Sequence, residues 1–372
     1  MRSALFSTGT SMVHLDIDEI AEGILRVLKP ESFQVCGPPT QESEEELIER
    51  QDSKIVAKPE VLEGQVVKEV TTDDLLADRR FPAVGIDEGL WRWVLGTHDI
   101  LVCISGHVNT WLNFPQWSKE VTRDWAVVVR SREVLNSQLP YSLRSRVYLL
   151  SSHHPIEGQV DRLASHFMQT QLRSTINSAM NLPGIKIDEI DGALRAYSHQ
   201  HIDKLGNTYR YVYEKTGRMV SFIVKRPRMQ TIVRHFGLDQ YSDDRAFYLS
   251  KMIQGRKSSD NYMRSHWIRE CDPRVTKENQ VTFCWILTPR NLIFRIETFY
   301  WMFKEKGDDI LNLVISDSYQ NGGGFLPLHQ TLAHEQFSIS EGLRQMFRAK
   351  LAQKMKIVSP ESTPWEAYGW GD

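Results

Sequence analysis

The strongest structural signal in this chain is a series of apolar residues that recur every three or four positions over residues 155–181. Pro155 suits the first position of a helix, so the pattern predicts one long amphipathic helix. Its apolar stripe consists of Ile156, Val160, Leu163, Phe167, Leu172, Ile176 and Met180. The pattern predicts another helix over residues 185–205, which Gly206 would end. Two long neighbouring helices constrain the chain towards helix-on-helix packing.

Most of the remaining chain also gives helical patterns. The prediction turns helical from residue 72, with a buried apolar segment over 86–113 and an amphipathic segment over 118–138. Further helices are expected over 242–254, 258–271, 289–306, 326–338 and 340–356. Short strands are expected within 55–70, and the runs TYRYVY and RMVSFIV predict a β-hairpin. The expected fold is therefore mainly α, with two helical lobes and a small β-hairpin in the middle.

Composition places flexible segments around these lobes. Residues 1–15 are expected to form an N-terminal arm, and residues 37–54 are acidic and predict an exposed loop. We assign 16–182 to an N-terminal lobe and 183–357 to a C-terminal lobe, because Pro183-Gly184 breaks the helical run. Residues 358–372 form a predicted tail, in which Trp365 and Trp370 are candidate contacts for oligomerisation.

The most informative stretch for function is residues 204–236, which carries eight Lys or Arg residues against the single acid Glu214. Tyrosines are interleaved with these bases. Basic side chains neutralise phosphates and aromatic rings stack on bases. Lys225, Arg226 and Arg228 surround the start of a predicted helix, where cations are unfavourable unless an anion binds there too. The predicted nucleic-acid-binding residues are Arg130, Arg132, Arg144, Arg146, Lys225, Arg226, Arg228 and Arg234.

Charge is distributed unevenly along the chain. Residues 1–100 hold twenty acidic and ten basic side chains, whereas the whole chain has a net charge of −2. The remaining residues therefore carry a net charge of +8, which favours a polyanionic partner. Two solvated surfaces of different composition would explain the same numbers.

Four separated cysteines without a CxxC pair favour a reducing, intracellular location, either cytoplasmic or virion-associated. We expect no membrane span, because no run of eighteen apolar residues occurs.

Catalytic and metal-binding motifs are incomplete. His199 and His201 resemble an HxHxD pattern, but on a helix their side chains point apart. His334-Glu335 begins an HExxH-like pattern in which Ser338 replaces the second histidine. His329 lies five residues before His334, which is a poor helical spacing for a shared metal. We therefore assign no catalytic residue, no metal ligand, no cofactor and no small-molecule substrate from the sequence.

In size, helical two-lobe layout, arms and charge distribution, the chain resembles the nucleoproteins of negative-strand RNA viruses, fungal members among them. The resemblance implies a non-enzymatic protein that oligomerises through its terminal arms. It also implies that single-stranded RNA is coated in a basic groove between the lobes. One alternative is an intracellular, self-assembling scaffold or capsid-like protein without RNA. A second alternative is a phosphoesterase or nuclease-type enzyme with a His/Asp cleft, although the sequence places no carboxylates and histidines together.

Overall fold

A computed structural model of the chain describes residues 58–63, 65–71, 81–95, 98–113, 116–131, 147–151, 175–225, 229–322, 325–337, 342, 344–346 and 349–350. For the described residues within 90–103 and 110–151 it gives the backbone alone. The expected N-terminal arm, acidic loop 37–54 and C-terminal tail lie outside these ranges, as does most of the predicted helix 155–181. Within that helix, residues 175–180 are helical. The division into two lobes at residue 182 stays a prediction.

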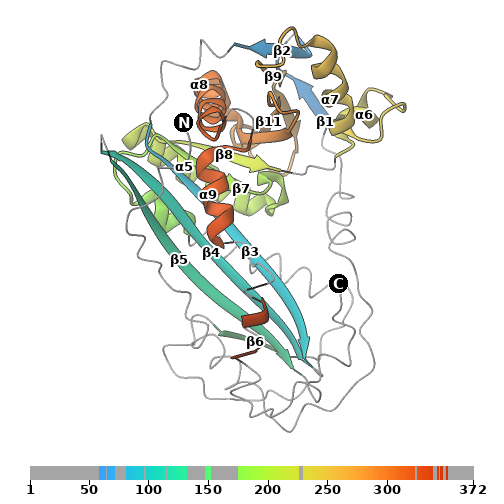
Figure 1. Cartoon of the computed structure of the whole chain (residues 1–372). Coiled ribbons are helices and arrows are strands. Elements are labelled where there is room, and N and C mark those ends of the chain that lie inside the picture. The colour runs from blue at the N-terminus through green and yellow to red at the C-terminus, as the bar shows by residue number, and fades with distance from the viewer. Residues whose placement is uncertain are drawn as a thin grey trace.

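A twelve-stranded mixed sheet organises the described part of the chain (Figure 1). Ten strands follow one path in the order β1-β10-β11-β12-β8-β7-β3-β4-β5-β6, while β2 and β9 pair beside it. The expectation of a mainly α fold with one small hairpin is therefore wrong. The bounds of the strands are β1 Lys58–Val61, β2 Val67–Val70, β3 Ala83–Leu95, β4 His98–Asn113, β5 Gln116–Ser131, β6 Val147–Ser151, β7 Ile187–Asp191, β8 Met219–Val224, β9 Tyr262–Ser265, β10 Ile268–Cys271, β11 Val281–Leu287 and β12 Ile293–Phe299.

Strands β3, β4 and β5 form a long antiparallel ribbon that extends away from the helices (Figure 1). The described parts of the segments 86–113 and 118–138, for which we expected buried and helical structure, lie in this ribbon. The helical prediction is wrong because an unbroken apolar run does not separate a buried strand from a helix by periodicity. The β-branched residues of the run Ala126-Val-Val-Val129 favour a strand, and tertiary pairing supplies the rest.

Strands β7 and β8 lie parallel to β3. The predicted helix 185–205 is instead strand β7, a short 3₁₀ turn over Leu194–Ala196 and the start of helix α5 (His199–Thr216). Ser198 caps α5 by accepting a hydrogen bond from the backbone N–H of His201. The first half of the predicted hairpin is wrong because TYRYVY lies inside α5, whereas RMVSFIV does contain a strand, β8.

The last third of the chain mixes correct and incorrect predictions. Strands β1 and β2 within 55–70 are confirmed, as are helices α7 (Asp244–Gly255) and α9 (Leu328–Phe337). The short helix that we expected to begin among Lys225, Arg226 and Arg228 instead begins at Thr231, as α6 (Thr231–His235), and Gly237 beyond it adopts φ 63°. The predicted helix 258–271 is wrong, because strands β9 and β10 occupy it. Strand β12 occupies the first part of the predicted helix 289–306, and helix α8 (Tyr300–Gln320) begins within its last part. A second 3₁₀ turn spans Lys277–Asn279.

Helices cover both faces of the central strands. Consecutive residues of a strand point to opposite faces. Asp188 of β7 accepts a hydrogen bond from Tyr209 of α5, whereas its neighbour Glu189 lies beside Asp317 of α8. Helix α9 crosses β3 on the Glu189 face (Figure 1). Among the described helices, none combines the length and apolar character that a membrane crossing requires.

Candidate functional site

Four charged or titratable side chains meet where β3, β7 and β8 pass beneath α9. We call Asp87, Asp191, Lys225 and His334 the outer group. The Lys225 Nζ lies 3.2 Å from Asp87 Oδ2 and 3.1 Å from Asp191 Oδ1. His334 Nδ1 lies 3.0 Å from the same Asp87 oxygen. Asp87 is fully buried, whereas 56% of the His334 side chain is exposed, so solvent reaches one side of the group.

Strand pairing explains why these residues converge. The parallel pairing of β3 with β7 ends at Ile86 opposite Ile190, so the next residues, Asp87 and Asp191, lie side by side. Lys225 directly follows β8, which is the other parallel neighbour of β7. Successive strand side chains alternate between faces, so both carboxylates point to the face that α9 covers.

The two carboxyl groups of the outer group have opposite pKa shifts. Burial disfavours charge on Asp87, but the hydrogen bond with His334 and the positive charge of Lys225 outweigh it and lower its pKa. Burial and the negative charge of Asp87 raise the pKa of Asp191 to about 7, although Lys225 opposes this shift. Two adjacent carboxylates of this kind are stabilised in their doubly ionised form by a cation between them.

The charges of Asp87 and Asp191, together with burial, also shift the pKa values of the groups beside them. Burial tends to lower the pKa of Lys225, but the carboxylates of Asp191 and Asp87 outweigh it and raise that pKa. The hydrogen bond to Asp87 raises the pKa of His334 despite partial burial. Burial, followed by the charges of Asp87 and Asp191, raises the pKa of Glu88 well above its ordinary value. The charge on each member of the site therefore changes the pKa values of the others.

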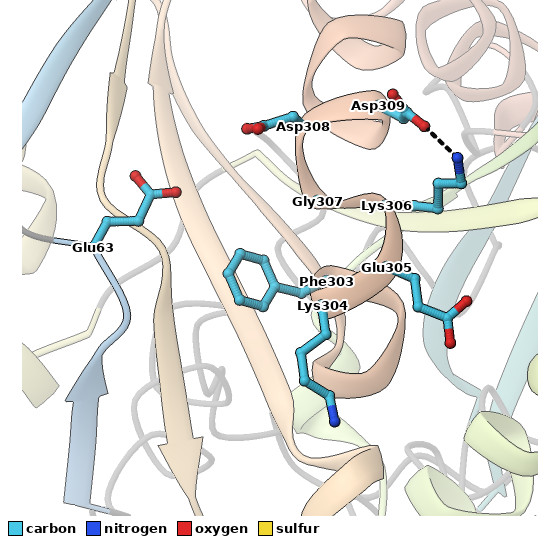
Figure 2. Close-up of a pocket in the computed structure, with 8 residues that line it drawn as sticks. All are labelled: Glu63, Phe303, Lys304, Glu305, Lys306, Gly307, Asp308 and Asp309. Atoms are coloured by element: carbon cyan, nitrogen blue, oxygen red, sulfur yellow. Dashed lines mark hydrogen bonds and ion pairs between the residues drawn. The ribbon is translucent and has the colours of Figure 1, made fainter.

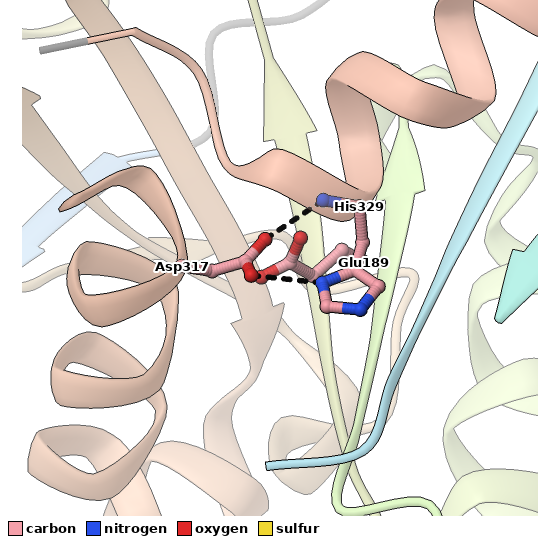
Figure 3. A group of neighbouring side chains, drawn as sticks. All are labelled: Glu189, Asp317 and His329. Carbon is pink, nitrogen blue, oxygen red and sulfur yellow. Dashed lines mark hydrogen bonds and ion pairs between the residues drawn. The ribbon is translucent and has the colours of Figure 1, made fainter. Parts of the chain in front are cut away.

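A second group of ligand-type side chains lies deeper on the same face. We call Glu189 of β7, Asp317 of α8 and His329 of α9 the inner group (Figure 3). One ligand atom from each lies within 4.8 Å of the others, and all three side chains are buried. Asp317 accepts hydrogen bonds from the His329 backbone N–H at 2.9 Å and pairs with His329 Nδ1 at 2.8 Å.

Gly85 of β3 permits the close approach of α9 on which both groups depend. A Cβ at this position would stand 2.0 Å from the backbone oxygen of His329 and 2.5 Å from its carbonyl carbon. Gly85 pairs with Glu189 across the parallel ladder. Gln330 anchors the same turn of α9 by donating a 3.0 Å hydrogen bond to the Ile86 carbonyl. A side chain at residue 85 would therefore push α9 away from both groups.

The opposite face of β7 carries a different arrangement. Asp188 accepts a 3.0 Å hydrogen bond from Arg218 Nε and another from Tyr209, and all three residues are buried. Arg218 also donates to the carbonyls of Met180 and Leu182. The donors and acceptors of this ion pair are satisfied within the protein, so it is structural, and it lies apart from the α9 face.

A cavity of about 410 Å³ lies elsewhere, against the first turns of α8. Figure 2 shows that its acidic side chains lie apart, and that Lys306 is paired with Asp309 at 2.8 Å. Helix α8 is distorted at Lys306, where φ is −141°. The lining residues are Glu63, Phe303, Lys304, Glu305, Lys306, Gly307, Asp308 and Asp309. This cavity does not contain the convergent ligands of the outer or inner group.

The structure describes only some of the residues that were predicted to bind nucleic acid. Lys225 belongs to the outer group, and Arg234 is exposed on α6. Arg130 lies on β5, whose side chains are outside the described part. Their role in nucleic-acid binding stays a prediction, as does that of the residues beyond the described ranges, which are Arg132, Arg144, Arg146, Arg226 and Arg228. Trp365 and Trp370 also lie outside those ranges.

Sequence reasoning set aside or missed the residues that the fold brings together. The incomplete HExxH-like pattern drew attention to His334 and His329, but only as partners for each other. Their partners are Asp87 and Asp317, which the local spacing does not reveal. His199 of the HxHxD-like pattern instead pairs with Asp272 at 3.3 Å on the surface. Acids that directly follow isoleucines, in GIDEG (85–89) and KIDEID (186–191), were the available signal.

No protein-family model and no curated protein sequence matches the chain. Several solved structures are similar to it over most of its length, among them three of NurA. The NurA nuclease from Sulfolobus solfataricus has 12% identity and a TM-score of 0.48, covering 80% of this chain and 88% of its own. Another NurA structure gives 12% and 0.43, covering 77% and 90%. NurA with manganese gives 10% and 0.41, covering 94% and 99%. At these values, the matches place no residue and no activity on this chain.

Two expectations are corrected at this point. The resemblance to viral nucleoproteins is wrong, because the helical two-lobe layout that carried it gives way to a mixed sheet in the described part. The expectation of a non-enzymatic chain is wrong in its premise that carboxylates and histidines do not converge. The fold gathers Glu189, Asp317 and His329 into one ligand set, and Asp87, Asp191 and His334 beside it.

Proposed function

We propose that this protein is a divalent-cation-dependent phosphodiesterase that cleaves nucleic acid. The observation that carries the proposal is the outer group. Two carboxylates from neighbouring parallel strands, Asp87 and Asp191, share one cationic partner beside a half-exposed imidazole. Carboxylate sites that hold divalent ions recur in enzymes that displace groups at phosphorus. This is the nuclease-type alternative that the sequence had left open.

The donor set of the outer group fits a divalent ion. The Lys225 ammonium already bridges Asp87 and Asp191 and so stands where a cation is favoured. Carboxylate oxygens are the ligands that Mg²⁺ and Mn²⁺ prefer. Asp87 and Asp191 would hold the ion. A bound divalent ion supplies Lewis acidity to a phosphoryl oxygen.

The other members of the outer group have separate tasks in this proposal. Lys225 would turn from the carboxylates to a phosphate oxygen, because an ammonium is a mobile point charge on a flexible stem. Asp87 holds His334 through Nδ1 and fixes its orientation. The exposed side of the imidazole is then able to accept or return a proton at Nε2. The eight Lys and Arg residues of 204–236 are consistent with a polyanionic substrate.

The test is cleavage of fluorescent single-stranded and double-stranded DNA and RNA oligonucleotides with Mn²⁺, with Mg²⁺ and with EDTA. We expect cation-dependent cleavage that falls about 100-fold or more in Asp191→Asn, since loss of even a supporting residue of a metal site costs 10–100-fold. Asp239→Asn is the matched control, because Asp239 is exposed and far from α9 in sequence. Equal cleavage by wild type and Asp191→Asn, or cleavage of none of the substrates, would refute the proposal.

A further inference from the structure

The inner group has the composition of a cation site of its own. We propose that Glu189, Asp317 and His329 bind a divalent transition-metal ion, Mn²⁺ or Zn²⁺, separately from the Asp87–Asp191 pair. The three ligands come from β7, α8 and α9, so one ion would join three elements of the fold (Figure 3). This inference does not require the outer group to catalyse any reaction.

Geometry is the first support. The ligand atoms of the inner group all lie within 4.8 Å of one another. Donors roughly 2.1 Å from a shared ion lie at most about 4.2 Å apart, so a small approach of the side chains would bring all three to one ion. In Figure 3 the Glu189 carboxylate points towards Asp317, and His329 presents Nδ1 to the same point. Among the described residues, no other set of three histidine, cysteine or acidic side chains meets this spacing.

The unpartnered state of Glu189 is the second, independent support. Glu189 is 0% exposed, and neither of its carboxyl oxygens has a hydrogen-bond partner. The Asp317 carboxyl group and the backbone N–H of Gln330 lie next to Glu189. Neither has the distance and angle of a hydrogen bond to it. A buried carboxyl without a partner costs several kcal/mol if it is ionised. An ion at the centre of the group would supply the missing partner for both oxygens.

Two further polar atoms near this point also have no hydrogen-bond partner. Ser221 pairs with Glu189 across the β7–β8 ladder, so both side chains point to the same face, and the buried Ser221 Oγ lacks a partner. Gln330 follows His329, and its Oε1 is also buried without a partner. Buried polar atoms without a partner, on residues that adjoin Glu189 and His329, indicate that an ion or another polar group belongs here.

The donor set selects the ion. Carboxylates suit Mg²⁺, Ca²⁺ and Mn²⁺, whereas an imidazole suits Zn²⁺ and other late transition metals. Two carboxylates with one imidazole therefore favour Mn²⁺ or Zn²⁺ over Ca²⁺. Ion binding would replace the His329 Nδ1–Asp317 contact, so the proton in that contact would be released to solvent.

The ion would position α9 without contacting a substrate, because the inner group is buried. His329 is at the start of α9, and His334 on the same helix reaches Asp87. Fixing His329 to Glu189 and Asp317 would therefore fix the distance of His334 from Asp87. Metal binding energy becomes folding energy when the ligands come from separate elements.

The experiment is metal analysis of the full chain after loading with Mn²⁺ or Zn²⁺ and desalting, together with thermal unfolding. We expect two equivalents in wild type, one in Glu189→Gln and one in Asp191→Asn. The loss in Glu189→Gln should be accompanied by a smaller metal-induced rise in Tm. A brief EDTA treatment of wild type should remove the outer ion and leave the buried one, which provides a second measurement if Glu189→Gln does not fold.

Each other outcome separates the two proposals. One equivalent in wild type that Asp191→Asn loses and Glu189→Gln keeps would overturn the inner site and leave the proposed function standing. One equivalent that Glu189→Gln loses and Asp191→Asn keeps would support the inner site and remove the ion of the proposed function. No bound metal in wild type would overturn both proposals.

Discussion

Replacement of Gly85 by alanine is the sharpest test of how β3 supports α9. The added Cβ would stand 2.0 Å from the His329 oxygen and 3.1 Å from the Gln330 nitrogen. Ordinary contacts between such atoms need about 3.5 Å, so a shift of roughly 1.5 Å is required. Strand β3 pairs at Gly85 with both β4 and β7, so the strand is held on two sides and α9 must move instead.

The magnitude follows from what that movement breaks. Overpacking of a tight contact costs about 1–3 kcal/mol. A shift of roughly 1.5 Å would also lengthen the 3.0 Å hydrogen bonds from Gln330 to the Ile86 carbonyl and between His334 and Asp87. Each lost hydrogen bond adds about 0.5–1.5 kcal/mol. We therefore expect Gly85→Ala to lower the free energy of unfolding by about 2–5 kcal/mol.

Urea denaturation followed by circular dichroism measures this difference. Gly255→Ala in α7 is the matched control, because its Cβ would meet only the methyl group of Val67, at 3.2 Å, and the sulfur-bound methyl of Met263, at 3.5 Å. The control should stay within about 1 kcal/mol of wild type, because small adjustments of side-chain tips are inexpensive. An unfolding midpoint of Gly85→Ala equal to that of the control would refute the proposed contact between β3 and α9.

Three further changes test separate parts of the structure. Lys225→Met should weaken nucleic-acid binding and lower its salt slope by roughly 0.7–0.9, and an unchanged slope would show that Lys225 contacts no phosphate. Arg218→Met should destabilise the fold by about 3–5 kcal/mol in urea, because it leaves the Asp188 carboxylate buried without its cation; a smaller loss in Asp188→Leu/Arg218→Met would confirm that cause. His266 bonds to the Tyr248 hydroxyl at 2.7 Å, and burial, followed by the charge of Arg264, lowers its pKa from 6.5 to about 4. The neutral form is therefore the stable one, so the part of the stability that depends on His266 is complete above pH 6.5. It should fall by about 2 kcal/mol as the pH drops towards 4, with allowance for screening, and His266→Gln should remove that dependence.

The sequence predicted those helices and strands whose ends carry capping or helix-breaking residues. Helices α7 and α9, the short strands β1 and β2 and the helix before Gly237 were all predictable from caps, breakers and patterning. The long ribbon of β3, β4 and β5 was not, because its apolar runs fit a buried helix as well as a strand. Strand β7 was mistaken for a helix because its acids at 188, 189 and 191 interrupt the alternation expected of a strand.

The candidate site was out of reach of local patterns for a different reason. Its members lie far apart in the sequence: the contact between His334 and Asp87 spans 247 positions, and that between Lys225 and Asp87 spans 138. From the sequence, each histidine could be compared only with residues a few positions away. The HExxH-like pattern was set aside because Ser338 replaces its second histidine. Only the parallel pairing of β3 with β7, and the crossing of α9, bring the ligands together.

The position of the acids is itself evidence that they serve a purpose beyond the fold. Asp87, Glu189 and Asp317 are each fully buried on the α9 face. Apolar residues of similar size at these positions would avoid the cost of removing carboxyl groups from water. Asp188, one residue from Glu189 on the other face, shows how the fold treats a structural acid, because it pairs with Arg218 and Tyr209. Glu189 has no such partner. A bound cation on the α9 face best explains why Asp188 has hydrogen-bond partners and Glu189 has none. Buried polar groups without partners are expected mainly where a site binds a ligand.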